Sequence, residues 1–157
     1  MWYMKPVTVS IDVPQSPGQV YDFLDVMAHH ERFTDHYLSG WHCAGPARGI
    51  GARASVTASL GGAKADVDIE VVQAEVARRI VERNISAGGR RLAHGTYAIE
   101  PLGTGGTHVS FTYSWVRAPL ADRLLSPAVR MTMRRANRTA MRRLAAELAR
   151  HASATGT

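Results

Sequence analysis

The chain has 157 residues, 45% of them hydrophobic and 20% charged, with 19 Lys and Arg against 13 Asp and Glu and a formal charge of +6. This composition is too apolar for a disordered chain and fits one domain over residues 1–157. No apolar run approaches the ~20 residues of a membrane-spanning helix, and the N-terminus lacks the layout of a secretory signal. The single cysteine, Cys43, excludes an internal disulfide and a cysteine-based zinc cage, and it fits the reducing cytoplasm.

The positive charge is concentrated near the C-terminus. Residues 117–157 contain nine arginines against two acidic residues, a net charge of +7, so residues 1–116 sum to −1. Such basicity raises nucleic acid or an anionic membrane as partners. No aromatic platform or recognition motif accompanies the arginines, which argues against nucleic acid. Arg134, Arg138 and Arg142 recur every four residues, as either a solvated helix face or a peripheral contact with an anionic membrane.

The first expected elements are a strand and a helix. Residues 7–13 alternate apolar and polar side chains, the period of a half-buried strand. Ser16, Pro17 and Gln19 then form a capping box with proline at the first helical position. The following apolar residues recur with helical spacing along one face, namely Val20, Phe23, Leu24, Met27 and Ala28.

A polar stretch over residues 29–37 predicts a loop or a second short helix. Its histidines, His29, His30 and His36, are interpreted as solvated loop residues and not as a metal site, because adjacent histidines point apart. A short strand follows, in which Tyr37, Ser39, Trp41 and Cys43 share one face.

Strand patterns dominate from residue 51 onward. Residues 52–60 and 63–71 alternate on either side of a GlyGly turn, and residues 78–85 form a less regular strand. Residues 91–101 and 107–116 flank a last turn. Pairing across it puts Ala93, Gly95, Tyr97 and Ile99 beside Val109, Phe111, Tyr113 and Trp115.

The longest predicted helix ends the chain. Residues 120–125 are a short lead-in, and Ser126-Pro127 repeats the cap-plus-proline start. The apolar stripe of this helix consists of Val129, Met133, Ala136, Ala140, Met141, Leu144 and Leu148. Residues from 150 or 151 to 157 are expected to be a frayed tail. The expected architecture is α+β, a curved antiparallel sheet of about seven strands around this helix, with one or two short helices after the first strand.

Four stretches of the sequence, residues 7–24, 95–102, 105–113 and 124–135, resemble the START-like (SRPBCC) superfamily, which has the helix-grip fold. The chain is most similar to its polyketide cyclase/dehydrase-like branch, over residues 7–150. The GlyGlyThr turn and the Arg-rich final helix are typical of bacterial members. The resemblance implies a mostly apolar cavity between the sheet and the last helix, used for lipids, polyketides or other hydrophobic small molecules.

Strand parity and helical spacing select the residues expected to bind such a ligand. They are Trp41, Tyr97, Phe111, Tyr113, Trp115, Arg130, Met133, Asn137 and Met141. The aromatic residues form either an ordinary core or a ligand site. Arg130 either points inward with a polar partner or lies at the edge of the stripe and reaches water, and Asn137 is the stronger cavity candidate.

Few residues of the expected cavity have side chains suited to catalysis. Four carboxylates, Asp66, Asp68, Glu70 and Glu100, fall on the outward face of their strands, and His94 and His108 are also out of phase. No nucleophile with a base and no phosphate-cradling loop is found, so no cofactor and no metal are expected. The sequence favours binding or transport of a hydrophobic molecule over a cyclase/aromatase-like enzyme, in which Tyr97 or Tyr113 would assist enolisation.

Overall fold

Seven antiparallel strands form one sheet in the order β1-β7-β6-β5-β4-β3-β2 in the computed structural model, which describes residues 3–155. In chain order the elements are β1 (Val7–Val13), α1 (Pro17–Asp25), the 3-10 helix η1 (Met27–His29), α2 (His30–Thr34), β2 (Leu38–Ala44), β3 (Arg53–Leu60), β4 (Ala63–Glu75), β5 (Arg79–Ser86), the 3-10 helix η2 (Ala87–Gly89), β6 (Arg91–Pro101), β7 (Thr107–Arg117), α3 (Leu120–Leu124) and α4 (Ser126–Thr155). The predicted curved sheet and long final helix are confirmed.

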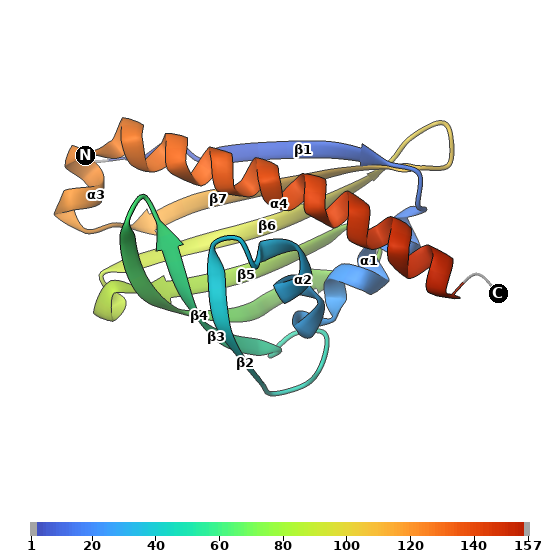
Figure 1. The fold of residues 1–157 in the computed structure, drawn as a ribbon, viewed down its shortest axis with the longest axis horizontal. Coiled ribbons are helices and arrows are strands. Elements are labelled where there is room, and N and C mark those ends of the chain that lie inside the picture. The colour runs from blue at the N-terminus through green and yellow to red at the C-terminus, as the bar shows by residue number, and fades with distance from the viewer. Residues whose placement is uncertain (1–2, 156–157) are drawn as a thin grey trace.

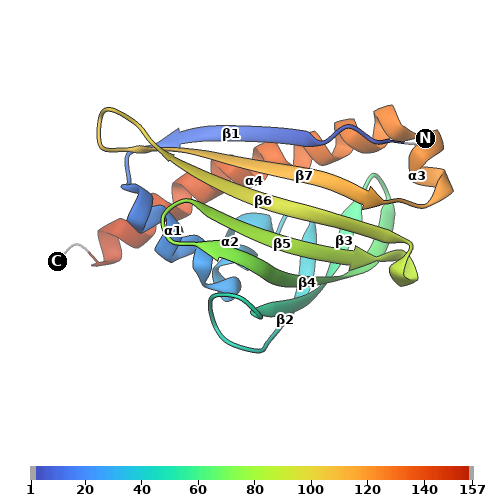
Figure 2. The same cartoon turned by 180° about the vertical axis from the view of Figure 1, so that it is seen from behind.

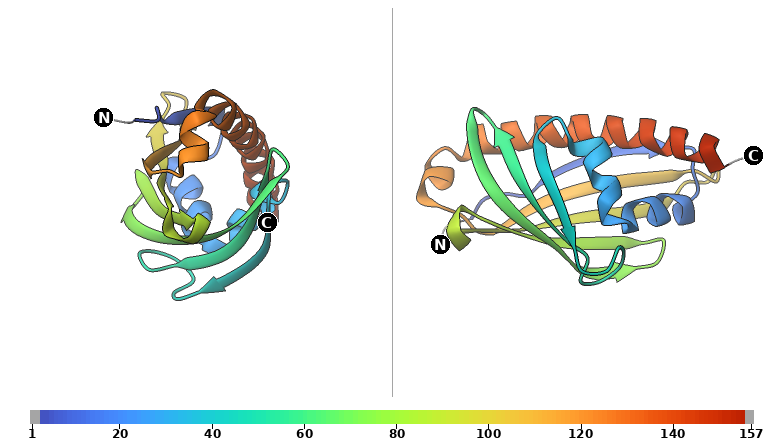
Figure 3. Two further views of the ribbon diagram at one scale, coloured as in Figure 1. Left: turned by 90° about the vertical axis from the view of Figure 1, so that its left-hand side faces the viewer. Right: turned by 60° about the horizontal axis from the view of Figure 1, so that its bottom comes forward.

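The sheet curls around α4, which crosses its concave face diagonally (Figure 1). From behind, the strands cover the helix (Figure 2), and the end view shows β2, β3 and β4 turning back toward it (Figure 3). The helices α1 and α2 fill the end of the sheet near the C-terminus of α4. None of the described helices is long and apolar enough to cross a membrane.

Glycine turns and alternating patterns set the strand register. Leu60 pairs with Ala63 across the predicted GlyGly turn. Between β6 and β7, Tyr97 pairs with Phe111 and Ala93 pairs with Trp115, as the sequence pattern predicts. Because side chains alternate between faces, this register directs the aromatic residues of β7 toward α4.

The capping box at the start of α1 is confirmed. The Ser16 hydroxyl accepts from the Gln19 amide at 3.3 Å, and the Ser16 amide donates to Gln19 Oε1 at 2.9 Å. These bonds satisfy donors that a helix N-terminus otherwise leaves unpaired. They fix the point at which the chain leaves β1.

The interior differs between the two halves of α4. The C-terminal half is buried in the main apolar core through Ala140, Met141, Leu144 and Leu148. The N-terminal half presents Val129, Met133 and Asn137 to a cavity beneath the sheet. The helix therefore closes a packed core at one end and a hollow at the other.

The expected frayed tail is wrong. The helix α4 continues to Thr155, so the tail is helical up to that residue, while 156–157 lie outside the described residues. The ring of His151 packs against Phe23 at 5.4 Å and against His29 at 5.6 Å. These contacts hold the last turns of α4 onto α1 and η1.

The polar stretch after α1 forms the short helices η1 and α2, so of the two predicted alternatives, a loop or a second short helix, the helix is confirmed. Its histidines are packed and hydrogen-bonded, so the expectation that they are solvated is wrong. His29 Nδ1 lies 2.8 Å from the Phe23 carbonyl, and His36 Nε2 lies 2.9 Å from the Ala136 carbonyl of α4. His30 is buried. The short helices fold these polar residues against apolar neighbours.

The expected face of the short strand is also wrong. A register shift between Ser39 and His42, with Gly40 at φ +64°, interrupts the alternation of β2. Trp41 consequently faces the cavity while Ser39 and Cys43 are exposed. A left-handed glycine within a bulge shifts the faces of the residues that follow.

Candidate functional site

A cavity of about 790 Å³ lies between the sheet and the N-terminal half of α4. Small side chains on β3 and β4, among them Ala58, Ala63 and Ala65, leave this space open on one side. Larger side chains of β6 and β7 bound the other. Its mouth lies among the β3–β4 turn, η2 and the α3–α4 connection, where Leu125 is 60% exposed.

Aromatic side chains form the floor of the cavity. Tyr97 and Phe111 have ring centroids 4.7 Å apart, and Tyr113 contacts Trp115 edge to face at 4.8 Å. A Cβ at Gly95 would lie 2.9 Å from the Phe111 ring, so glycine allows that ring to lie across β6. The floor is thus rigid and largely apolar, with hydroxyl groups at the tyrosine tips.

A row of polar side chains from β5 crosses the cavity wall. Glu82, Asn84 and Ser86 alternate with outward residues, and all three are buried and line the cavity. Glu82 pairs with Gly95 of β6, which places its side chain over the aromatic floor. Burial raises the pKa of Glu82 from 4.5 to about 8, so the carboxyl group is protonated at neutral pH.

His30 of α2 faces this carboxyl group. Its Nε2 lies 2.7 Å from the Leu24 carbonyl, and since a carbonyl only accepts, Nε2 carries the proton. Burial lowers the pKa of His30 to about 4, and the neutral ring turns its bare Nδ1 toward Glu82 Oε2 at 3.4 Å. A carboxylate and a bare ring nitrogen would repel each other, whereas a protonated Glu82 is compatible with this geometry.

Asn137 of α4 lies in the same polar cluster. The Tyr37 hydroxyl donates to Asn137 Oδ1 at 3.3 Å, and burial together with Glu82 raises the pKa of Tyr37. Three residues of the cavity wall each have one buried side-chain atom without a hydrogen-bond partner, namely Asn137 Nδ2, Trp41 Nε1 and Glu82 Oε2. An unpaired buried polar group costs about 1–3 kcal/mol, so the wall carries hydrogen-bonding capacity that the protein does not use.

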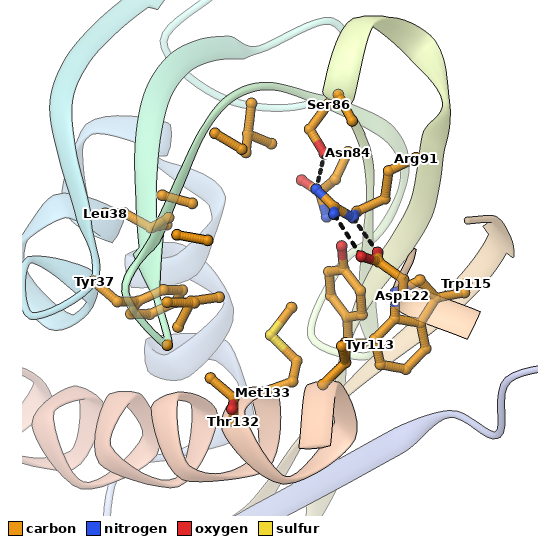
Figure 4. Close-up of a pocket in the computed structure, with 18 of the residues that line it drawn as sticks. Tyr37, Leu38, Asn84, Ser86, Arg91, Tyr113, Trp115, Asp122, Thr132 and Met133 are labelled. Carbon is orange, nitrogen blue, oxygen red and sulfur yellow. Dashed lines mark hydrogen bonds and ion pairs between the residues drawn. The ribbon is translucent and has the colours of Figure 1, made fainter. Parts of the chain in front are cut away.

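A second polar group closes the opposite end of the cavity, near its mouth. Arg91 binds Asp122 of α3 through two hydrogen bonds, of 2.7 and 3.0 Å, and a third nitrogen donates to Ser86 at 3.0 Å (Figure 4). The Tyr113 hydroxyl points toward this pair (Figure 4). Bidentate pairing satisfies both charges and ties α3 to β6.

The structure distributes the expected ligand-binding residues between cavity and core. Those on the cavity wall are Trp41, Tyr97, Phe111, Tyr113, Trp115, Met133 and Asn137. The prediction that Arg130 binds the ligand is corrected, because its guanidinium turns to the edge of the sheet. There it donates to the carbonyls of Lys5 at 3.0 Å and Pro6 at 3.3 Å. The prediction for Met141 is also corrected, because this residue lies in the packed core, beyond the end of the cavity.

The polar residues of the cavity were missed from the sequence. In β5 the apolar residues Ile80 and Val81 fall on opposite faces, so alternation alone does not select an inward side. The pairing of Glu82 with Gly95 is the signal that places it, since Gly95 was already assigned to the inner face. Arg91 and Asp122 meet only through the docking of α3, which no local pattern indicates.

The sequence profile of the polyketide cyclase / dehydrase and lipid transport family matches residues 4–152, and the chain belongs to this family. The predicted membership of the START-like (SRPBCC) superfamily is thereby confirmed. No curated protein matches the sequence.

Solved structures share the fold at low sequence identity. TTHA0849 from Thermus thermophilus is 19% identical with a TM-score of 0.75, covering 94% of this chain and 99% of that one. The Zhui aromatase/cyclase from Streptomyces sp. R1128 is 15% identical with a TM-score of 0.71, covering 93% and 94%. Ara h 8.0201 is 13% identical with a TM-score of 0.65, covering 92% and 97%. The helix-grip fold is confirmed, and family and neighbours together support hydrophobic ligand binding or a cyclase role.

The buried carboxyl group predicts a specific pH dependence of stability. Between pH 4.5 and 8 the unfolded chain releases the Glu82 proton while the folded chain keeps it, so the free energy of unfolding falls as pH rises. Replacing Glu82→Gln removes this effect. From pH 5 to pH 7.5, urea unfolding should show the wild type losing roughly 2–4 kcal/mol relative to E82Q. Glu70→Gln, at a half-buried carboxylate of β4 that pairs with Arg83, should follow the wild-type profile. Parallel profiles for wild type and E82Q would contradict a protonated Glu82.

Proposed function

We propose that this protein binds or transports a hydrophobic small molecule of lipid, quinone or polyketide type in the cavity between the sheet and α4. The observation that carries the proposal is the cavity itself, about 790 Å³ with a largely aromatic and aliphatic wall. Small-molecule sites commonly measure about 300–1,000 Å³ and combine apolar walls with a few placed polar groups. Aromatic rings that face an unfilled space lack partner atoms on one side, and an apolar ligand supplies them.

Filling the cavity should abolish ligand binding. Ala58 lines the cavity and the adjacent Ser59 is exposed on the other face of β3, so Ala58→Trp and Ser59→Trp form a matched pair. Native mass spectrometry of protein purified from its own host is expected to show a retained small molecule in the wild type and in S59W. The A58W variant should carry at least tenfold less. Empty wild-type protein that also fails to bind liposomes or aromatic probes would contradict the proposal.

The ligand is loaded at an anionic membrane surface. The described residues place no acidic partner beside Arg134 or Arg138, so both guanidinium groups are available to lipid phosphates. Leu124 and Leu125, 73% and 60% exposed, lie near the cavity mouth on the adjoining segment. Basic residues on α4 together with apolar residues near the opening suit transfer of a lipid-soluble ligand from a bilayer.

Removing the arginine stripe should weaken membrane binding. Each basic residue near an anionic leaflet contributes about 1 kcal/mol, or roughly fivefold in partitioning. The triple replacement of Arg134, Arg138 and Arg142 by Ala is expected to reduce cosedimentation with phosphatidylserine vesicles by about 100-fold. Replacing three exposed arginines in β3, β5 and the turn before β5, namely Arg53, Arg79 and Arg78, changes the charge equally and should have little effect. Equal losses in both variants would show that only net charge matters.

Cyclisation of a poly-β-ketone is the second candidate function, and the observation favouring it is the set of buried cavity hydroxyls. Burial raises the pKa of Tyr97 and of Tyr113, the latter to about 12, so both keep their protons. A hydroxyl donating to a ketone oxygen stabilises the enol that attacks a second carbonyl. Incubation with a linear poly-β-ketone thioester should then yield a cyclised product by mass spectrometry. Tyr97→Phe is expected to slow turnover at least about 100-fold with binding unchanged. No product from the wild type would exclude this function and leave ligand binding intact.

A further inference from the structure

The inner end of the cavity contains more hydrogen-bond donors than the protein satisfies. The Asn137 side chain is 2% exposed, and its Nδ2 has no partner although its Oδ1 accepts from Tyr37. Glu82, 4% exposed, makes no hydrogen bond through Oε2. Native structures rarely leave such groups unpaired, so each indicates a missing partner. Both residues line the cavity.

The surrounding groups hold this end of the cavity uncharged. The bare Nδ1 of His30, whose proton is on the side of the Leu24 carbonyl, faces Glu82 Oε2 at 3.4 Å, which favours a protonated carboxyl group. This distance is too long for a normal O–H···N hydrogen bond, so the carboxyl proton is not held by His30. The other titratable groups facing Glu82 are the Tyr37 hydroxyl, between α2 and β2, and the Tyr97 hydroxyl of β6. Burial raises the pKa of both hydroxyls, so both remain neutral over the pH range in which Glu82 titrates.

We infer that this cluster is a subsite for an uncharged carbonyl oxygen of the ligand, which accepts hydrogen bonds from the Asn137 amide and from the Glu82 carboxyl group. The inference rests on the proposed function, because it names the ligand chemistry that the same cavity selects. A ketone, quinone, lactone or ester oxygen supplies the acceptor that both donors lack.

The same arrangement discriminates against charged ligands. A carboxylate brought to this end would be desolvated without a cation to pair with it, because Arg91 is already bound to Asp122 and Ser86 and the other cations of the wall, Lys64 and Arg90, are exposed to solvent. An ammonium group would meet the unpaired donor of Asn137, and it would gain a partner only by ionising Glu82 in a buried site. Uncharged carbonyl compounds are therefore the class that the subsite accepts.

Loss of the Glu82 proton should weaken carbonyl binding. The carboxylate has no hydrogen to donate, and its charge repels the carbonyl oxygen. Because burial raises the pKa of Glu82 to about 8, roughly nine-tenths of the sites are protonated at pH 7 and about one-tenth at pH 9. Affinity for a carbonyl ligand is expected to fall about tenfold over this range.

Two fluorescent naphthalenes test the subsite. Prodan, 6-propionyl-2-dimethylaminonaphthalene, has a ketone whose hydrogen bonding shifts its emission to longer wavelength, and 2-dimethylaminonaphthalene lacks the ketone. Titration of the full chain at pH 7 and pH 9 gives Kd for both, with far-UV circular dichroism to verify folding. Prodan should bind about tenfold more weakly at pH 9, with a blue-shifted emission, whereas the ketone-free probe should be unaffected by pH.

Variants separate the donor from mere packing. Glu82→Gln keeps a donor that does not titrate, so prodan should bind it equally at both pH values. Glu82→Leu is expected to bind prodan about five- to tenfold more weakly at both pH values, with unchanged affinity for the ketone-free probe. Glu70→Gln, outside the cavity, should retain the wild-type pH profile.

The outcomes distinguish failure of the carbonyl subsite from failure of the proposed ligand-binding function. Prodan binding by the wild type that is independent of pH, or an unchanged pH dependence in E82Q, would overturn the carbonyl subsite while leaving a hydrophobic cavity. Failure of the wild type to bind either probe at any pH would contradict the proposed function itself. If E82L does not fold, the comparison of wild type with E82Q still decides.

Discussion

One helix has to cover the apolar face of a seven-stranded sheet, and the rest of the structure follows from that constraint. Neighbouring strands lie about 4.8 Å apart and a helix with its side chains is about 10–12 Å across, so α4 shields only part of the face. Curling of the sheet brings β2, β3 and β4 round toward the helix (Figure 3). Between them the alanines of β3 and β4 are too small to meet the aromatic residues of β7, and the cavity is the space that remains.

Exclusion of water determines the electrostatics of this space. Buried groups pair or lose their charge. Arg91 and Asp122 keep their charges and form an ion pair. Glu82 and His30 are instead both neutral at pH 7. Most arginines of α4 instead lie on its outer side, while Arg130 binds backbone carbonyls at the edge of the sheet. Basicity and the cavity thus belong to opposite faces of one helix, which explains how a chain of +6 charge holds a site suited to uncharged molecules.

The fold was predictable to the level of register because its signals are local. The strands β6 and β7 alternate over their whole length and are joined by a short turn, so the pairing of Tyr97 with Phe111 follows from the alternation and the turn alone. The aromatic wall of the site follows from the same parity. The inward face could not be predicted for β5, where Ile80 and Val81 lie on opposite faces. It was predicted wrongly for β2, where Gly40 allows a bulge. In both strands the inward side depends on the neighbouring strand.

The sequence by itself determined the order of the elements, the aromatic face of β7, and a final helix with an apolar stripe and an outer row of arginines. Periodicity and capping residues act over one or two turns of chain, so they can be read along it. Only the tertiary structure decided that the stripe is solid core at Met141 and cavity wall at Met133, and that Arg130 turns away to the edge of the sheet. It also decided that Glu82 meets His30 in a neutral pair, because burial and protonation depend on what packs over a residue and not on its neighbours in sequence.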